Sequence, residues 1–246
     1  MGFNYKTKPY EHQEEALLRS FNRKNYAYFM EMGCGKSKVL IDNITWLHEE
    51  GQIDTAVIIA PKGVYMNWKN SEIPIHLPDN IEKNVYVWKA SANKTEKKIL
   101  EEGVKTRDKL RILLVNVESF ATVKVKKYLD AFIHRSNFIL AVDESTTIKN
   151  IKAKRTKAVL ELGDSAKYKR ILTGSPITQS PMDLYAQCAF LDKDLLGFDS
   201  YWSFQGRYAV VRQTRMGNHS FQQVVGFRNL EELTDKLQRF AYRVTK

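Results

Sequence analysis

Short apolar runs alternate with stretches of helical periodicity along most of the chain. Each run is continuous and rich in β-branched and aromatic residues, which is typical of strands buried on both faces of a parallel sheet. The predicted strands cover residues 26–30, 55–60, 85–88, 111–116, 138–142 and 169–172.

The segments between these runs predict helices. Apolar residues recur at helical spacing from Val39 to Leu47, and Gly51 marks the end of that helix. Further helices are expected around residues 16–21, 64–69, 92–102, 124–133 and 149–160. Strands that alternate with helices predict an α/β fold, a doubly wound parallel sheet with right-handed crossovers and helices on both faces.

The pattern changes after Leu196. An aromatic cluster follows at residues 201–208, and two extended runs, 208–214 and 221–227, flank Gly217 and Asn218. This arrangement predicts a hairpin, and a helix over 230–240 is expected to close the chain. We therefore expect a main lobe over 1–196 and a small extension of hairpin and helix over 197–246.

A glycine-rich loop follows the first predicted strand and precedes the helix that begins near Lys36. It reads Glu-Met-Gly-Cys-Gly-Lys-Ser over residues 31–37, although the full pattern has a glycine where this chain has Met30. Glycines let backbone N–H groups crowd round an anion, and the helix dipole points its positive end at the same place. The loop therefore predicts a phosphate site formed by Gly33, Cys34, Gly35, Lys36 and Ser37, in which Ser37 can also ligate magnesium.

Two adjacent carboxylates, Asp143 and Glu144, end the buried run 138–142. The carboxyl edge of a parallel sheet is where ligands bind, and carboxylates are costly to bury without a purpose. We predict that Asp143 holds magnesium through its water shell and that Glu144 orients and polarises the attacking water. The alternative is that Asp143 only caps the next turn.

Three small residues, Thr173, Gly174 and Ser175, two of them with hydroxyl groups, follow the strand 169–172. They lie where a sensor of the bound phosphate or metal is expected, with a plain polar turn as the alternative. Near the start of the chain, Gln13 offers a donor and an acceptor together, which suits the edge of an adenine ring. An ordinary helix-start role is the alternative for Gln13.

Amino-acid composition indicates which kind of partner and which cellular compartment to expect. The chain has 246 residues, of which 43% are hydrophobic, and carries 39 Lys and Arg against 28 Asp and Glu, a formal charge of +11. The excess of positive charge favours a polyanionic partner such as nucleic acid, although a solvated basic surface would give the same count. Cys34 and Cys188 are too few for a disulfide framework or a structural metal site. With no apolar run long enough for a membrane and no signal peptide, we expect a cytoplasmic protein of a bacterial cell or a phage-infected host.

Taken in order, these motifs resemble the first ATPase lobe of the Swi/Snf-like translocases in helicase superfamily two. The loop 31–37 is similar to that family's nucleotide loop, and Ala60-Pro61-Lys62 followed by Trp68 is similar to its next motif. Residues 143–150, Asp-Glu-Ser-Thr-Thr-Ile-Lys-Asn, resemble its acidic box, although many members have alanine and histidine where this chain has Ser145 and Thr146. The run 172–177, with 183–185 beyond it, resembles the family's coupling motif.

The resemblance implies a RecA-like fold that binds ATP and Mg²⁺, with Lys36, Asp143 and Glu144 as catalytic residues and Gln13 as the adenine reader. It also implies an enzyme, a DNA-dependent ATPase that moves along duplex DNA. The nucleic-acid contacts are then expected at Pro61, Lys62, Trp68 and Asn116. The alternatives are a strand-separating DNA or RNA helicase of the same superfamily, and a module that binds nucleotide or DNA without turnover.

A second RecA-like lobe, with arginines that complete the catalytic site, is a further implication of the resemblance. This chain stops at Lys246, where that lobe would begin, so we expect a piece of a longer protein that is weakly active or inactive alone.

Overall fold

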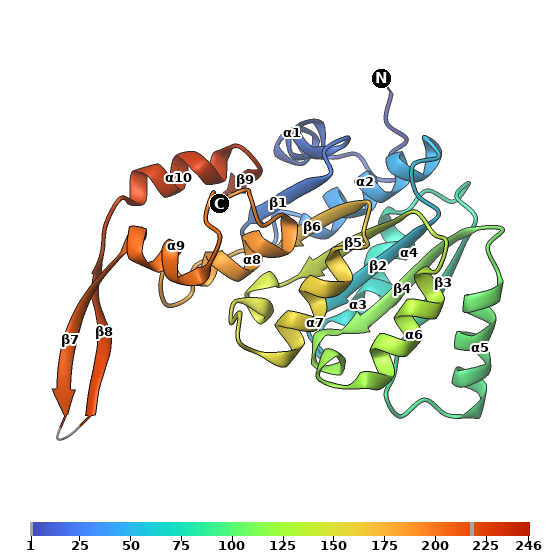
Figure 1. The fold of residues 1–246 in the computed structure, drawn as a ribbon. Coiled ribbons are helices and arrows are strands. Elements are labelled where there is room, and N and C mark those ends of the chain that lie inside the picture. Colours follow the sequence, from blue (N-terminus) through green and yellow to red (C-terminus); the bar gives the residue numbers. More distant parts are fainter. Residues whose placement is uncertain (1, 217–218) are drawn as a thin grey trace.

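A parallel sheet of seven strands forms the centre of the molecule, and helices cover both of its faces (Figure 1). The computed structural model describes residues 2–216 and 219–246. The order across the sheet is β3-β4-β2-β5-β6-β1-β9, and every pair of neighbouring strands in it is parallel. Its strands are β1 (Asn25–Met30), β2 (Thr55–Ala60), β3 (Lys83–Val87), β4 (Leu110–Asn116), β5 (Phe138–Asp143), β6 (Tyr168–Leu172) and β9 (Ala241–Val244). The doubly wound α/β fold predicted from the sequence is confirmed.

Short helical segments connect the strands. Most are α-helices, joined by one π-helical turn, η1, and two 3₁₀ turns, η2 and η3. They are α1 (Glu11–Ser20), α2 (Lys36–Glu49), α3 (Tyr65–Asn67), η1 (Trp68–Glu72), α4 (Ile73–His76), α5 (Lys94–Lys105), η2 (Val117–Ala121), α6 (Val123–Ile133), η3 (Ser145–Ile148), α7 (Lys154–Gly163), α8 (Asp183–Leu191), α9 (Tyr201–Tyr208) and α10 (Leu230–Gln238).

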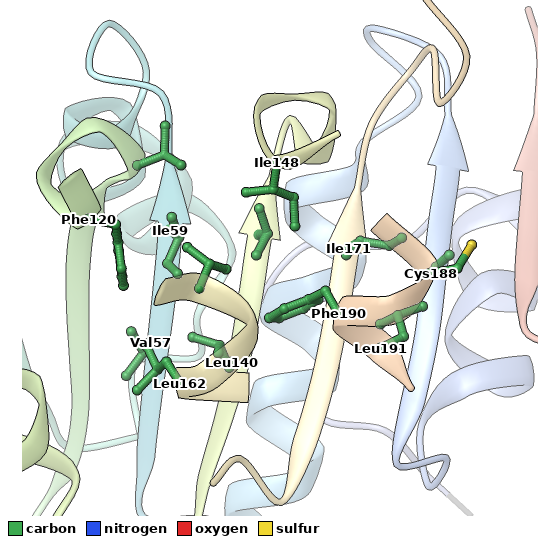
Figure 2. Packing of buried hydrophobic residues seen from close by; sticks show 14 of the residues in the cluster. Val57, Ile59, Phe120, Leu140, Ile148, Leu162, Ile171, Cys188, Phe190 and Leu191 are labelled. Carbon is green, nitrogen blue, oxygen red and sulfur yellow. The ribbon is translucent and has the colours of Figure 1, made fainter. Parts of the chain in front are cut away.

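Two hydrophobic cores lie on opposite faces of the sheet, because successive side chains of a strand point to opposite sides. In β2, Val57 and Ile59 belong to one core, while Ala56 and Ile58 belong to the other. The first core packs under α5 to α10, and the second packs under α1 to α4. Figure 2 shows Phe190 among the buried side chains of the first core. Burial on both faces explains why the central strands read as continuous apolar runs.

Arg170 in β6 is fully buried, and its guanidinium is hydrogen-bonded on every side. Its Nε donates to Asn43 Oδ1 at 2.9 Å, and its Nη2 donates to the carbonyls of Ser20 and Arg23, each at 2.9 Å. A buried charge is tolerated when such partners replace water. Arg170 thus ties β6 to α1 and α2 and, as its place in the predicted strand indicated, is a structural residue.

The end of the chain differs from the prediction. The helix expected over 230–240 ends at Gln238, and β9 then pairs with β1, where Met30 faces Val244. The expected extension therefore contributes an edge strand to the main sheet. The segment Ala241–Val244 is too short to be recognised as a strand locally, and its partner lies far away in the sequence.

The predicted hairpin is present as a separate antiparallel pair, β7 (Ala209–Met216) and β8 (His219–Phe227). It extends away from the main sheet beyond α9 (Figure 1). The predicted turn at Gly217 and Asn218 lies outside the described residues.

The helix predicted over 149–160 begins later than expected, at Lys154. Residues 145–148 form the turn η3, and Asn150 Oδ1 accepts a hydrogen bond from the Lys152 N–H at 3.0 Å. Such a local side-chain bond competes with helical hydrogen bonding.

None of the helices in the described part of the chain is long and apolar enough to span a membrane.

Candidate nucleotide-binding site

The glycine-rich loop lies between β1 and α2, at the carboxyl edge of the sheet. Gly33 and Gly35 have φ of 85° and 79°, a conformation that favours glycine, and Gly35 caps the N-terminus of α2. Lys36 and Ser37 are the first residues of that helix and are both half-buried. The strand, loop and helix context that makes a phosphate site plausible is therefore present.

Gln13 is packed into this loop. Its Nε2 donates to the Cys34 carbonyl at 3.2 Å, and its Oε1 accepts from the Tyr10 N–H at 3.0 Å. A Cβ on Gly35 would lie 2.1 Å from Gln13 Nε2, so the fit leaves no room for a side chain there. His12 Nε2 also lies 2.9 Å from the Cys34 carbonyl oxygen. The amide predicted to read adenine is engaged with α1 and the loop in this structure.

Asp143 ends β5 and is 6% exposed. Its Oδ2 accepts from the Trp68 indole N–H at 2.9 Å, and its Oδ1 accepts from the Glu144 N–H at 3.0 Å. Burial raises the pKa of Asp143 to about 6, an effect that the Trp68 hydrogen bond and the charge of Lys36 oppose. A buried carboxylate with a raised pKa gains from a nearby cation, which fits its predicted role at magnesium.

Glu144 has a left-handed backbone, with φ of 47° and ψ of 60°. This conformation costs a non-glycine residue about 1–3 kcal/mol and is often found at functional sites. The side chain of Glu144 accepts a hydrogen bond from Thr173 Oγ1 at 3.3 Å. The predicted water-orienting residue is therefore in contact with the predicted coupling segment.

That coupling segment, 173–175, lies beside the glycine-rich loop. A Cβ on Gly174 would approach the Met32 backbone nitrogen to 3.3 Å, so a larger residue would press on the loop. The Ser175 N–H donates to Thr173 Oγ1 at 3.2 Å, which holds the turn together. Loop 31–35 and segment 173–175 are thus in direct backbone proximity.

A cavity of about 540 Å³ opens between these elements. Lys36, Glu144 and the segment 173–175 line it together. Gln13, Gly33, Cys34 and Ser37 are not among its lining residues; they lie in or against the loop. The full lining is Glu31, Met32, Lys36, Glu144, Thr146, Thr173, Gly174, Ser175, Thr178 and Lys246.

The predicted magnesium ligands, Ser37 and Asp143, do not line the cavity, but each is next in sequence to a lining residue, Lys36 or Glu144. A hydroxyl, Ser37, and a carboxylate, Asp143, are hard oxygen ligands of the kind that Mg²⁺ takes. Among the described residues, no group of three or more His, Cys, Asp and Glu side chains could hold a metal by itself. A magnesium ion held by Ser37 and Asp143, as predicted, would therefore need its other ligands from a nucleotide and water.

The predicted nucleic-acid residues lie at another part of the same edge. Ala60 in β2 is in register with Asn116 in β4, so Pro61 and Lys62, which follow Ala60, lie next to Asn116. Lys62 is exposed. Asn116 Oδ1 accepts from Ser119 N–H at 2.9 Å, and so part of its amide is used to cap η2.

The role predicted for Trp68 has to be corrected. Its side chain is 1% exposed and donates to Asp143, so it cannot touch nucleic acid directly. The aromatic character of Trp68 reflects packing in the second core, and its N–H connects the segment after Lys62 to Asp143.

Three residues near the cavity had no individual role predicted from the sequence. Gln187 in α8 is buried, accepts from Ser145 Oγ at 2.6 Å and donates to the Pro176 carbonyl at 2.8 Å. Asp183 Oδ2 accepts from the N–H groups of residues 178 and 179, each at 2.9 Å. Lys246 reaches the loop, where a Cβ on Gly33 would lie 3.1 Å from its Nζ. The sequence around Gln187 and Lys246 contains no motif that would indicate a role. Asp183 lies in the run 183–185, which resembles part of the family's coupling motif.

Known proteins with similar sequences and structures cover most of this chain. A protein of Xenopus laevis, "SWI/SNF-related matrix-associated actin-dependent regulator of chromatin subfamily A-like protein 1", is 28% identical over 189 residues, which is 76% of this chain and 17% of that protein. The Bos taurus "DNA annealing helicase and endonuclease ZRANB3" is 26% identical over 216 residues, 88% of this chain and 18% of that protein.

A solved structure, the "Sulfolobus solfataricus SWI2/SNF2 ATPase core in complex with dsDNA", matches with a TM-score of 0.73 and 25% identity, covering 100% of this chain and 46% of that chain. The chain thus spans about a sixth of the length of the sequence relatives and about half of the solved one.

The sequence profile of the SNF2-related domain matches residues 17–246. This match covers nearly the whole chain and includes the glycine-rich loop, the Asp143-Glu144 pair and the segment 173–175. The chain belongs to the SNF2-related domain family.

Proposed function

We propose that this chain is the ATP-binding first lobe of a DNA-dependent ATPase that couples hydrolysis to movement along duplex DNA. The convergence of Lys36, Glu144 and Thr173 on one cavity carries the proposal, because phosphoryl transfer needs a phosphate cradle, a water-orienting group and a sensor together. The DNA-bound Sulfolobus relative supports duplex DNA as the partner.

Each residue would act at a defined place. The loop N–H groups and Lys36 would bind the phosphates of ATP, whose magnesium ion would neutralise charge between them. Ser37 and Asp143 would hold that ion. Glu144 would orient water toward the terminal phosphoryl group, and Thr173 would hold the Glu144 carboxylate and report its position to segment 173–175.

The second lobe is part of the proposal. An arginine that stabilises the transition state is worth about a thousandfold to a hundred-thousandfold in rate. Arg170 is buried under α1 and α2, and none of its donors is free for a nucleotide. We therefore expect the catalytic arginines in a following lobe of the longer protein.

Steady-state phosphate release tests the function. The assay compares this chain with the same chain extended through the second lobe, each with duplex DNA, single-stranded DNA or RNA. We expect strong turnover only for the extended protein with duplex DNA. Stimulation by RNA or single strands, with strand displacement, would favour an unwinding helicase, and ATP binding without turnover in the extended protein would leave only a binding module.

A further inference from the structure

A second groove lies on the hairpin side of the molecule, away from the predicted DNA contacts at Lys62. Its volume is about 740 Å³. One wall is the segment 149–152 after η3, and the opposite wall is one face of the β7–β8 hairpin, with α9 between them. Figure 1 shows this hairpin standing out from the sheet beyond α9.

The described hairpin residues that line the groove are uncharged. Val211, Gln222 and Val224 line it, and Val211 is in register with Val224. Because side chains alternate along a strand, Arg212 points to the other face. The groove therefore combines apolar side chains with amide groups, which can pair with the polar edges of a flat ring.

Trp202 provides an exposed aromatic surface at this groove. It is 60% exposed although it is a large apolar residue. Its ring packs edge-on against Tyr201, with centroids 5.5 Å apart, and Tyr201 packs edge-on against Tyr185 at 5.7 Å. These contacts hold the indole in place, so stacking of a ligand on it would cost little conformational entropy.

Lys152 lies next to Trp202, with its Nζ 5.1 Å from the indole centroid. Lys152 is exposed, whereas the neighbouring Lys149 is engaged with Asp183 at 3.5 Å and with Thr178 at 2.5 Å. The acidic group in the groove, Asp183, is therefore already satisfied, and Lys152 is the cation available to a ligand.

Two stretches of sequence that border the groove contain no acidic residues. Between residues 145 and 160 the charged side chains are all basic, and between 200 and 230 they are all arginine. A polyanion that leaves the groove along α7 meets further exposed cations at Lys154 and Lys157. The positive charge beside the groove therefore comes from the wall formed by 149–152 and from the start of α7, and it complements phosphate.

We propose that this groove binds an unpaired strand of nucleic acid, with a base stacked on Trp202 and a phosphate near Lys152. A fixed exposed indole beside a lysine, with amides across the groove, matches the way proteins bind single strands. A base within a duplex is covered by its neighbours and cannot reach the indole. The site is separate from the predicted duplex contacts and does not depend on ATP hydrolysis.

Fluorescence anisotropy with a short labelled thymidine oligonucleotide tests the site, with RNA of matching sequence and a duplex of equal length as the other arms. Trp202→Ala should weaken single-strand binding about tenfold or more, and Trp202→Phe should restore most of it. Lys152→Glu should also weaken binding, while Lys124→Glu, the same charge change on exposed α6, should have little effect. Comparison of the DNA and RNA arms identifies the preferred strand.

Tryptophan fluorescence gives a direct readout. Bound strand should quench emission of the wild-type chain, and Trp202→Phe should lose this quenching while Trp46, Trp68 and Trp88 remain. Binding of an ATP analogue, measured by calorimetry, should be unchanged in the groove variants, which separates this proposal from the nucleotide site.

Three results would overturn the proposal. The first is equal affinity of Trp202→Ala and the wild type for the single strand. The second is an equal loss of single-strand affinity in Lys152→Glu and Lys124→Glu. The third is displacement of the strand by polyglutamate of equal charge, which would indicate an acidic protein partner.

Discussion

The indole N–H of Trp68 donates a hydrogen bond to Oδ2 of Asp143 at 2.9 Å, across 75 positions of sequence. Trp68 begins η1, the segment that follows the exposed Lys62 loop, and Asp143 ends β5. One bond thus joins the element after the predicted DNA contact to the predicted magnesium carboxylate.

Trp68→Phe should test this bond. The variant keeps most of the buried apolar volume but leaves Asp143 Oδ2 without its donor, which costs about 1.5–3 kcal/mol for a charged acceptor. We expect a lower free energy of unfolding and a higher magnesium concentration for half-maximal ATP-analogue binding. Trp88→Phe is the matched control, because the buried Trp88 Nε1 has no hydrogen-bond partner. Equal effects in both variants would show that the bond is unimportant.

Lys36→Ala should abolish binding of a non-hydrolysable ATP analogue in calorimetry. Lys36 is the lysine at the start of α2 and lines the cavity with Glu144. Lys98→Ala, an exposed lysine on α5, should leave the affinity unchanged. Retained affinity in Lys36→Ala would remove the assignment of the phosphate loop.

Glu144→Gln should keep nucleotide binding and slow hydrolysis about a hundredfold or more in the extended, two-lobe protein. The amide cannot take a proton from water, but it preserves size and can still meet Thr173 Oγ1. Single-turnover hydrolysis measures the effect, and Glu118→Gln, on the turn η2, serves as a control for loss of one carboxylate. Hydrolysis at the wild-type rate in Glu144→Gln would show that another residue orients the attacking water.

Lys62→Ala should reduce the salt dependence of duplex binding. One lost phosphate contact lowers the slope of log affinity against log salt by about 0.9 for duplex DNA. Anisotropy across a salt series, with Lys98→Ala as control, measures the slope. An unchanged slope would mean that Lys62 makes no phosphate contact.

Stability should depend on pH through Asp42. Burial raises the pKa of Asp42 to about 6, although Lys38 Nζ lies 2.7 Å from its Oδ2. Because the folded state then holds the proton more tightly than the unfolded state, stability falls as pH rises from about 4 to about 6, by up to about 3 kcal/mol. Urea unfolding of the wild type and of Asp42→Asn measures this effect. As the pH rises over this range, the free energy of unfolding of the wild type should fall relative to that of Asp42→Asn. A constant difference would show that the Asp42 pKa is not raised.

The sequence alone determined the central architecture and the phosphate loop. Strands buried on both faces leave continuous apolar runs in the sequence. A phosphate loop needs small residues, here 33–35, followed by a lysine, Lys36. Both signals are local. The placement of Asp143 and Glu144 at the end of a buried run was sufficient to predict their position at the sheet edge.

Only the tertiary structure decided the features that depend on pairing between distant segments. The strand β9 forms where Val244 pairs with Met30. Trp68 lies inside because Asp143 accepts its N–H. Glu144 takes a left-handed backbone beside Thr173. Periodicity reports which side chains are buried, but it carries no information on which distant donor a buried acceptor will find. For that reason the resemblance in sequence placed Trp68 at nucleic acid, whereas the fold places its N–H on Asp143.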